Sequence, residues 1–205
     1  MKKIILTCVA TVGLASGAFA QGSILVDNSS VGGSITGGQT SSAATGFYGN
    51  YTLQVWYLNG ALPSNLAGAS NLQDYNNLTT DGFTLAQTYA NQNITQLNAG
   101  AFSLGELDMP GASTTSTVIA LAAWASGLPG TTATPGASFG GAQYGGVLAF
   151  LNPTAAYETH PVPTPANLTG WSSSDNLAMT PVPEPTTMAL AGLGGLALFL
   201  ARRKK

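Results

Sequence analysis

Cysteine is almost absent from this chain of 205 residues, whose one cysteine is Cys8, close to the N-terminus. Residues 21–181 therefore contain no thiol that could form a disulfide, act as a nucleophile or bind zinc. A domain in this region has to be stabilised by a hydrophobic core, and a stretch of roughly 160 residues is long enough to bury one. We expect one domain spanning residues 21–181.

Positive charge is missing from the same region. The basic residues all lie at the two chain ends, as Lys2, Lys3, Arg202, Arg203, Lys204 and Lys205. The acidic residues other than Glu184 all lie within residues 21–181, so no carboxylate there has a cationic side-chain partner. A surface without Lys or Arg cannot neutralise phosphates, which excludes nucleic acid as a partner. An acidic polysaccharide would bind only through bridging cations.

Histidine is equally scarce, because the single one, His160, stands beside a proline in an irregular stretch. Without a second histidine or a cysteine, no zinc site can be assembled there. A serine–histidine–aspartate triad would lack the Gly-x-Ser-x-Gly motif that marks its serine. A histidine in a surface loop is the favoured interpretation, and no cofactor is expected.

Two carboxylates, Glu106 and Asp108, are spaced so that both would face the same side of a strand. Such a pair could act in a glycosidase or could bind a hard cation such as calcium. Carboxylates that border Met109-Pro110-Gly111 are more often a solvated strand end, and we favour that interpretation. The chain is therefore expected not to be an enzyme.

The N-terminal residues 1–20 have the pattern of a signal peptide. Lys2 and Lys3 precede an apolar run from Ile4 to Ala15, and Ala18-Phe19-Ala20 is the small-x-small pattern of a cleavage site. Cleavage after Ala20 would make Gln21 the first residue of the mature chain. Export by the general secretion machinery and cleavage by signal peptidase are thus expected.

The C-terminal residues 182–205 have three consecutive parts: Val182-Pro183-Glu184-Pro185, an apolar run from Thr186 to Ala201, and Arg202-Arg203-Lys204-Lys205. As a helix, the apolar run would reach about 24 Å, short of the roughly 30 Å of a hydrocarbon core. The basic end would fix that terminus in the cytoplasm. Pro183 and Pro185 are expected to keep Val182 to Pro185 extended and non-helical at the outer membrane surface, where a processing enzyme could recognise this segment.

These three parts, with Gly192, Gly194 and Gly195 in the helix, resemble the PEP-CTERM sorting signal of bacterial surface proteins. The resemblance implies export, a transient inner-membrane form and processing by a membrane-embedded exosortase near the Pro-Glu-Pro. It further implies release or attachment at the surface of an organism that makes an exopolysaccharide matrix. It implies no activity.

The region between the two signals is predicted to be mostly strand. Tyr51 to Leu58 alternates, with Tyr51 and Tyr57 on one face and Trp56 on the other, and Asn59-Gly60 turns the chain. Thr115 to Trp124 is apolar enough to be buried on both faces. Further strands are predicted at Ser23–Val26, Phe83–Tyr89, Ile94–Leu97, Phe102–Leu107, Val147–Leu151 and Trp171–Met179, with a helix over Leu85–Gln92 as the alternative to one of them. Short strands between Gly, Pro and Asn turns indicate an all-β fold, an antiparallel β-sandwich or jelly roll.

Trp56 and Trp171 are the candidates for stacking on sugar, because amphipathic rings lie at recognition surfaces. A sandwich also needs large core residues, and for Trp56 we favour the core. The sequence thus predicts an exported, non-enzymatic protein of the cell surface or extracellular matrix. A carbohydrate-binding module associated with exopolysaccharide and a glycan hydrolase are the alternatives, and the exposure of Trp56, Trp171, Glu106 and Asp108 distinguishes them.

Overall fold

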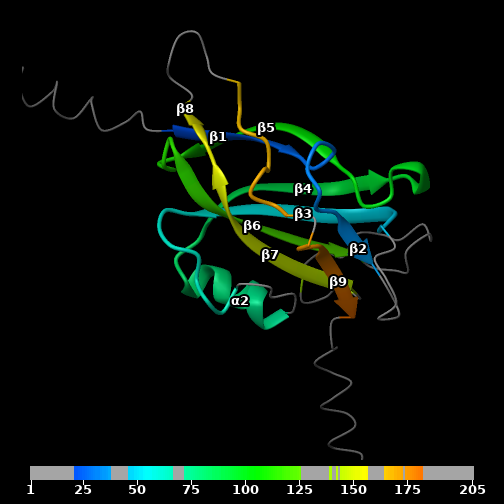
Figure 1. Ribbon diagram of the computed structural model, residues 1–205. Helices are drawn as coiled ribbons and strands as arrows, with labels where there is room; N and C mark the ends of the chain where they lie inside the picture. The colour runs from blue at the N-terminus through cyan, green and yellow to red at the C-terminus, as the bar shows by residue number, and fades with distance from the viewer. Residues whose placement is uncertain are drawn as a thin grey trace, which may run out of the picture.

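The fold is an all-β sandwich of two sheets, seen in a computed structural model (Figure 1). The structure describes residues 21–37, 46–66, 72–125, 139, 142, 144–156, 164–172 and 174–181. The smaller sheet has the order β5-β1-β8, with β5 at Ser103–Pro110, β1 at Gln21–Asp27 and β8 at Ala155–Ala156. The larger sheet has the order β2-β9-β7-β6-β3-β4. Its strands are β2 Ile35–Gly37, β9 Leu177–Pro181, β7 Tyr144–Pro153, β6 Ser116–Ala125, β3 Gly49–Leu58 and β4 Thr84–Ile94.

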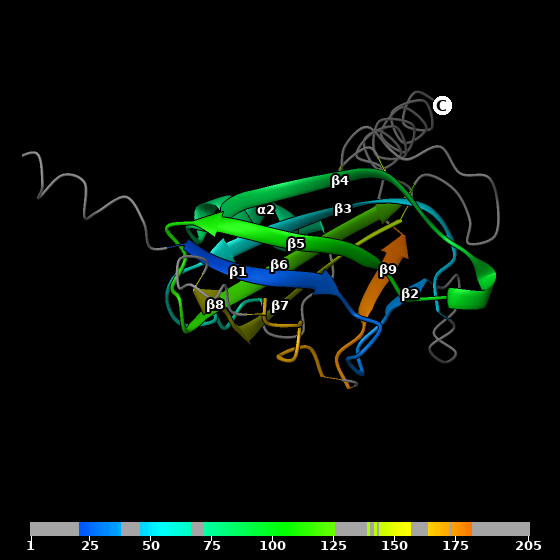
Figure 2. The same ribbon diagram turned by 90° about the horizontal axis from the view of Figure 1, so that it is seen from above.

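Strand pairing is antiparallel with one main exception. β2 runs parallel to β9, so that Ile35 lies opposite Leu177 and Gly37 lies opposite Met179. The prediction of an antiparallel sandwich therefore needs a correction at this edge. The parallel pair joins the beginning and the end of the domain, since β2 and β9 are far apart in sequence (Figure 2).

The main core fills the space between the two sheets. Tyr51, Leu53, Val55 and Tyr57 of β3 all point into it and are at most 8% exposed, as their alternation predicts. The small sheet contributes residues such as Ile24 from its opposite side.

A second core lies on the outer face of the large sheet. The helix α2, Leu72–Thr80, covers this face and places Tyr75 and Leu78 against it (Figure 1). Val118 and Trp124 of β6 belong to this cluster, while Ile119 of the same strand belongs to the main core. The prediction that this strand is buried on both faces is thus confirmed.

The structure corrects several predicted elements. Helix α2 was not predicted, whereas the alternative helix over Leu85–Gln92 is wrong because those residues belong to β4. The strand predicted at Ile94–Leu97 is mostly wrong, since β4 ends at Ile94 and a 3-10 helix, η1, follows at Gln96–Asn98. The last strand begins at Leu177 instead of Trp171.

Candidate functional site

The candidate site begins where the described structure ends, at strand β9. Leu177 and Met179 are buried, and the strand is held by β2 on one side and by β7 on the other. Its last two residues, Thr180 and Pro181, lie opposite Gly145 and Tyr144 of β7. The predicted sorting motif starts at Val182, so it follows the last residue of a sheet strand without a linker.

The remaining parts of both predicted signals lie outside the described residues. These are Ala18 and Ala20 at the N-terminus, and Val182 to Pro185, Thr186 to Ala201 and Arg202 to Lys205 at the C-terminus. Within the described residues, the structure contains no helix that is long and apolar enough to cross a membrane. Gln21 is the first residue of β1, so cleavage after Ala20, which stays a prediction, would leave this strand complete.

Trp56 lies under helix α2 with 8% of its surface exposed. Its indole Nε1 donates a hydrogen bond to Oε1 of Gln54 at 3.1 Å, and the hydroxyl of Tyr75 donates to the same oxygen at 3.0 Å. The rings of Trp56 and Tyr75 meet edge to face with centroids 6.2 Å apart. Trp56 therefore helps to hold helix α2 on the large sheet through its contact with Tyr75.

Trp171 is more deeply buried, at 1% exposure, and fills the main core between Phe102 and Phe150. Both ring centroids lie 6.0 Å from that of Trp171. Its Nε1 donates to the backbone carbonyl of Asp175, and a Cβ built on Gly33 would lie only 2.1 Å from that nitrogen. The ring is thus enclosed on its edge as well as on its faces.

Trp56 thus lies in a core, the interpretation that the sequence favoured, and the alternative that Trp56 and Trp171 stack on sugar needs a correction. Stacking needs a ring face that a ligand can reach, and both rings are covered by protein. A hollow of about 280 Å³ does lie beside Trp171, lined by the β7 edge, Leu62, Ser172 and Asp175. It is smaller than the range of about 300 to 1,000 Å³ typical of small-molecule sites, and we assign it no ligand.

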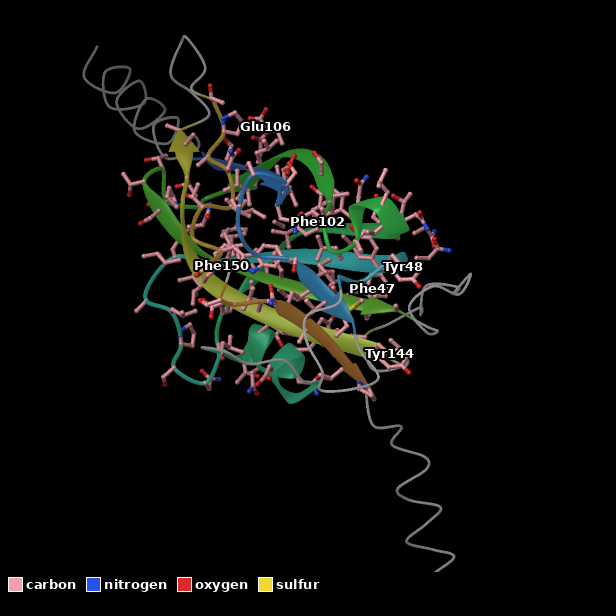
Figure 3. All side chains as sticks on the ribbon, turned by 45° about the vertical axis from the view of Figure 1, so that its right-hand side comes forward. Phe47, Tyr48, Phe102, Glu106, Tyr144 and Phe150 are labelled. Atoms are coloured by element: carbon pink, nitrogen blue, oxygen red, sulfur yellow. The ribbon has the colours of Figure 1, made fainter. Side chains whose placement is uncertain are left out.

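Glu106 and Asp108 are exposed on the outer face of β5, while Leu107 and Met109 between and after them point into the core. Figure 3 shows Glu106 on the side of the small sheet that faces away from the large sheet. The two carboxylates do share one face, as their spacing predicts. No group of three His, Cys, Asp or Glu side chains that could hold a metal ion occurs among the described residues.

Asp27, at the end of β1, is the carboxylate whose environment changes its acidity. Burial opposes its ionisation, but hydrogen bonds from Ser103 and Ser29 outweigh burial and lower the pKa of Asp27 below its ordinary value. These bonds fix the turn that follows the strand. His160 and Glu158 lie outside the described residues, so their predicted loop position is not tested.

Comparison with known proteins identifies the C-terminal segment. Residues 181–205 match the model of the PEP-CTERM protein-sorting motif. This match confirms the resemblance seen in the sequence, and it supports an exported protein that an exosortase processes and that is sorted to the cell surface. No curated protein and no solved structure matches the chain significantly. The match begins at Pro181, which is also the last residue of β9.

Proposed function

We propose that this chain is a non-enzymatic protein of the cell surface or extracellular matrix, whose β-sandwich is delivered by its C-terminal signal. The observation that carries the proposal is the match at residues 181–205, which begins in the last strand of the sandwich. The signal is therefore attached directly to a folded domain that becomes the mature product.

The route follows from the order of the two signals. The general secretion machinery exports the chain, and signal peptidase cuts after Ala20 so that Gln21 becomes the N-terminus. The apolar run from Thr186 to Ala201 then holds a transient form in the inner membrane. Exosortase then cuts near Pro183-Glu184-Pro185. Because β9 ends at Pro181, cleavage there leaves every strand of the sandwich intact.

The described surface supports a structural role over an enzymatic one. Glu106 and Asp108, the carboxylates considered for catalysis, stand exposed on the outer face of one strand. A glycosidase pair has to flank the bond that it cleaves, with carboxyl groups on two sides of the sugar. Exopolysaccharide remains the polymer with which the domain would associate, through hydrogen bonds or, where the polymer is acidic, through bridging cations, because residues 21–181 contain no Lys or Arg.

The test is the intact mass of the protein recovered from the surface of its native host. We expect a chain that begins at Gln21 and ends near Pro183-Glu184-Pro185. Recovery of chains that still carry Met188 to Lys205 would contradict the sorting role. A second measurement addresses activity: the purified protein and its Glu106→Gln/Asp108→Asn variant should release equal, background amounts of sugar from the host's polysaccharide. Release that depends on these two residues would make the protein a hydrolase.

A further inference from the structure

One end of the large sheet collects the terminal residues of five strands. β3 and β7 begin there, at Gly49 and Tyr144, and β4, β6 and β9 end there, at Ile94, Ala125 and Pro181. The register confirms the alignment, because Ile94 lies opposite Gly49, Ala125 opposite Tyr144, and Tyr144 opposite Pro181. We call these five residues and the loop at residues 95–100 the tail-exit end.

The distance between the tail-exit end and a membrane is limited by the sequence. Only Val182 to Pro185 separate β9 from the apolar run that begins at Thr186. Even fully extended, four residues span about 14 Å, and the headgroup layer takes up roughly 6 Å of that distance. The sandwich is longer than this four-residue connection, because the ten residues of β3 extend about 33 Å. The connection is therefore too short to bring the opposite end of the sandwich to the membrane.

The tail-exit end also carries an unusually exposed leucine. Leu97, in η1 directly after β4, is 93% exposed. Across the sheet, β4 is four strands from β9, which corresponds to about 19 Å. Figures 1 and 2 both show η1, β2 and β9 gathered at the end opposite the start of β1.

The loop that presents Leu97 is fixed by hydrogen bonds at its base. Gly100 donates its N–H to the carbonyl of Phe47 at 2.8 Å, and the carbonyl of Gly100 accepts from Ile35 N–H at 3.0 Å. Nδ2 of the buried Asn28 donates to the same carbonyl at 2.9 Å. Gly100 has φ +83°, a left-handed conformation that favours glycine. These hydrogen bonds fix the turn that contains Leu97, so the Leu97 side chain stays away from the core.

The distribution of charged residues also distinguishes the tail-exit end from the opposite end of the domain. The five strand-terminal residues and residues 95–100 are all uncharged. Glu106 and Asp108 lie toward the opposite end, since β5 continues from them to Pro110, which pairs with Gln21 and accepts a hydrogen bond from the Tyr57 hydroxyl. Asp27 is the carboxylate nearest to the loop along the small sheet, and it is engaged by Ser29. Asp74, in the first turn of α2, is only 7% exposed. A bilayer with anionic lipids repels carboxylates, and the residues that define the tail-exit end include none.

From these observations we infer that the tail-exit end rests on the outer surface of the lipid bilayer while the sorting tail is inserted, and that Leu97 enters the interface. The inference depends on the proposed function, because the short tether exists only if the tail enters the membrane. It specifies the surface that meets the bilayer and thus the side from which exosortase must reach Glu184.

The experiment uses the membrane-held form, expressed with its signal peptide in a bacterial host without exosortase and identified by intact mass. Removal of the signal peptide also removes Cys8, so a cysteine introduced by Asn98→Cys or Thr114→Cys carries the only label. Asn98 lies in η1, and Thr114 is exposed just before β6, at the opposite end. Each donor-labelled protein is reconstituted in phosphatidylethanolamine–phosphatidylglycerol vesicles that contain an acceptor lipid.

We expect strong energy transfer from the label at position 98 and clearly weaker transfer from the label at 114, which would lie farther from the bilayer by about the length of a strand. Leu97→Asp should reduce the transfer from position 98, whereas the matched control Leu151→Asp should not, because Leu151 is 54% exposed but lies near the other end of β7. Equal transfer from both labels, or equal effects of the two leucine variants, would overturn the inference. Co-sedimentation with the vesicles reports tail insertion separately, so protein that fails to co-sediment contradicts the proposed function itself.

Discussion

Pro181, the last residue of β9, is the antiparallel partner of Tyr144, the first residue of β7. Figure 3 shows Tyr144 beside the end of β9. Because the sorting-motif match also begins at Pro181, the signal and the sheet share this residue. The motif is therefore joined directly to a strand whose Leu177 and Met179 are buried, and we expect β9 to be part of the stable unit.

The first prediction tests whether β9 belongs to the cooperative core. Met179→Ala should lower the free energy of unfolding by about 2 to 5 kcal/mol, because Met179 is only 1% exposed. Thr180→Ser, which keeps the hydroxyl on the exposed side of the same strand, should change it by no more than about 0.5 kcal/mol. Urea unfolding of the processed protein measures both. Equal effects would mean that β9 unfolds independently of the sandwich.

The second prediction concerns Trp56 and Trp171. Trp171→Ala should cost about 3 to 5 kcal/mol of unfolding free energy, the usual range for removing a buried aromatic ring. Trp56→Phe keeps an aromatic ring but loses the bond to Gln54 and part of the packing of the indole, so it should cost less, about 1 to 2 kcal/mol. Retention on the host's polysaccharide should be the same for Trp56→Phe and the unsubstituted protein. Lost retention at unchanged stability would restore the sugar-stacking role.

The third prediction follows from the absence of Lys and Arg in residues 21–181. The carboxylates there repel one another and have no cationic side-chain partner, so salt should screen repulsion without weakening any ion pair. We expect the melting temperature to rise between low and moderate sodium chloride. The rise should be smaller in Glu106→Gln/Asp108→Asn, which removes two exposed negative charges. A melting temperature that falls with salt would contradict this account.

The sequence correctly predicted the strands that have a clear hydrophobic pattern. In β3 the alternation placed Tyr51 and Trp56 on opposite faces, which the structure buries in two different cores. In β6 the apolar run predicted a strand that is buried on both sides. These patterns are local, and period two survives because each strand is paired regularly with its neighbour.

Strand β4 shows why the same reasoning gave an ambiguous result elsewhere. Its register against β3 shifts twice, between Tyr51 and Leu53 and between Val55 and Trp56. Each bulge adds a residue, so the inward positions Ala86 and Tyr89 are three apart instead of two. A spacing of three is typical of a helix face, which explains the competing helix over Leu85–Gln92.

Helix α2 and the segment at Trp171 depend on contacts that are distant in sequence. Asn and Thr are frequent in Leu72–Thr80 and are weak helix formers, so the helix relies on Tyr75 and Leu78 packing against the large sheet. Trp171 packs against Phe102, which directly precedes β5, and against Phe150 of β7. No local sequence pattern predicts either feature. The sequence did favour a core position for Trp56 and a solvated strand end for Glu106 and Asp108, whereas the burial of Trp171 became known only from the structure.

The last prediction tests the sorting motif itself. Glu184→Ala should leave export and removal of the signal peptide intact, because residues 1–20 and the sandwich are unchanged, but it should trap an unprocessed form in the inner membrane. Deleting Arg202 to Lys205 should have a different effect, since losing the basic stop lets some chains cross the membrane uncut. Cell fractionation followed by intact mass separates the two outcomes, and Asp175→Asn serves as a control because it removes one exposed carboxylate upstream of β9. Normal processing of Glu184→Ala would show that the enzyme does not read this residue. The substitution lies close to the folded domain, since Glu184 is only three residues after Pro181, the residue of β9 that pairs with Tyr144.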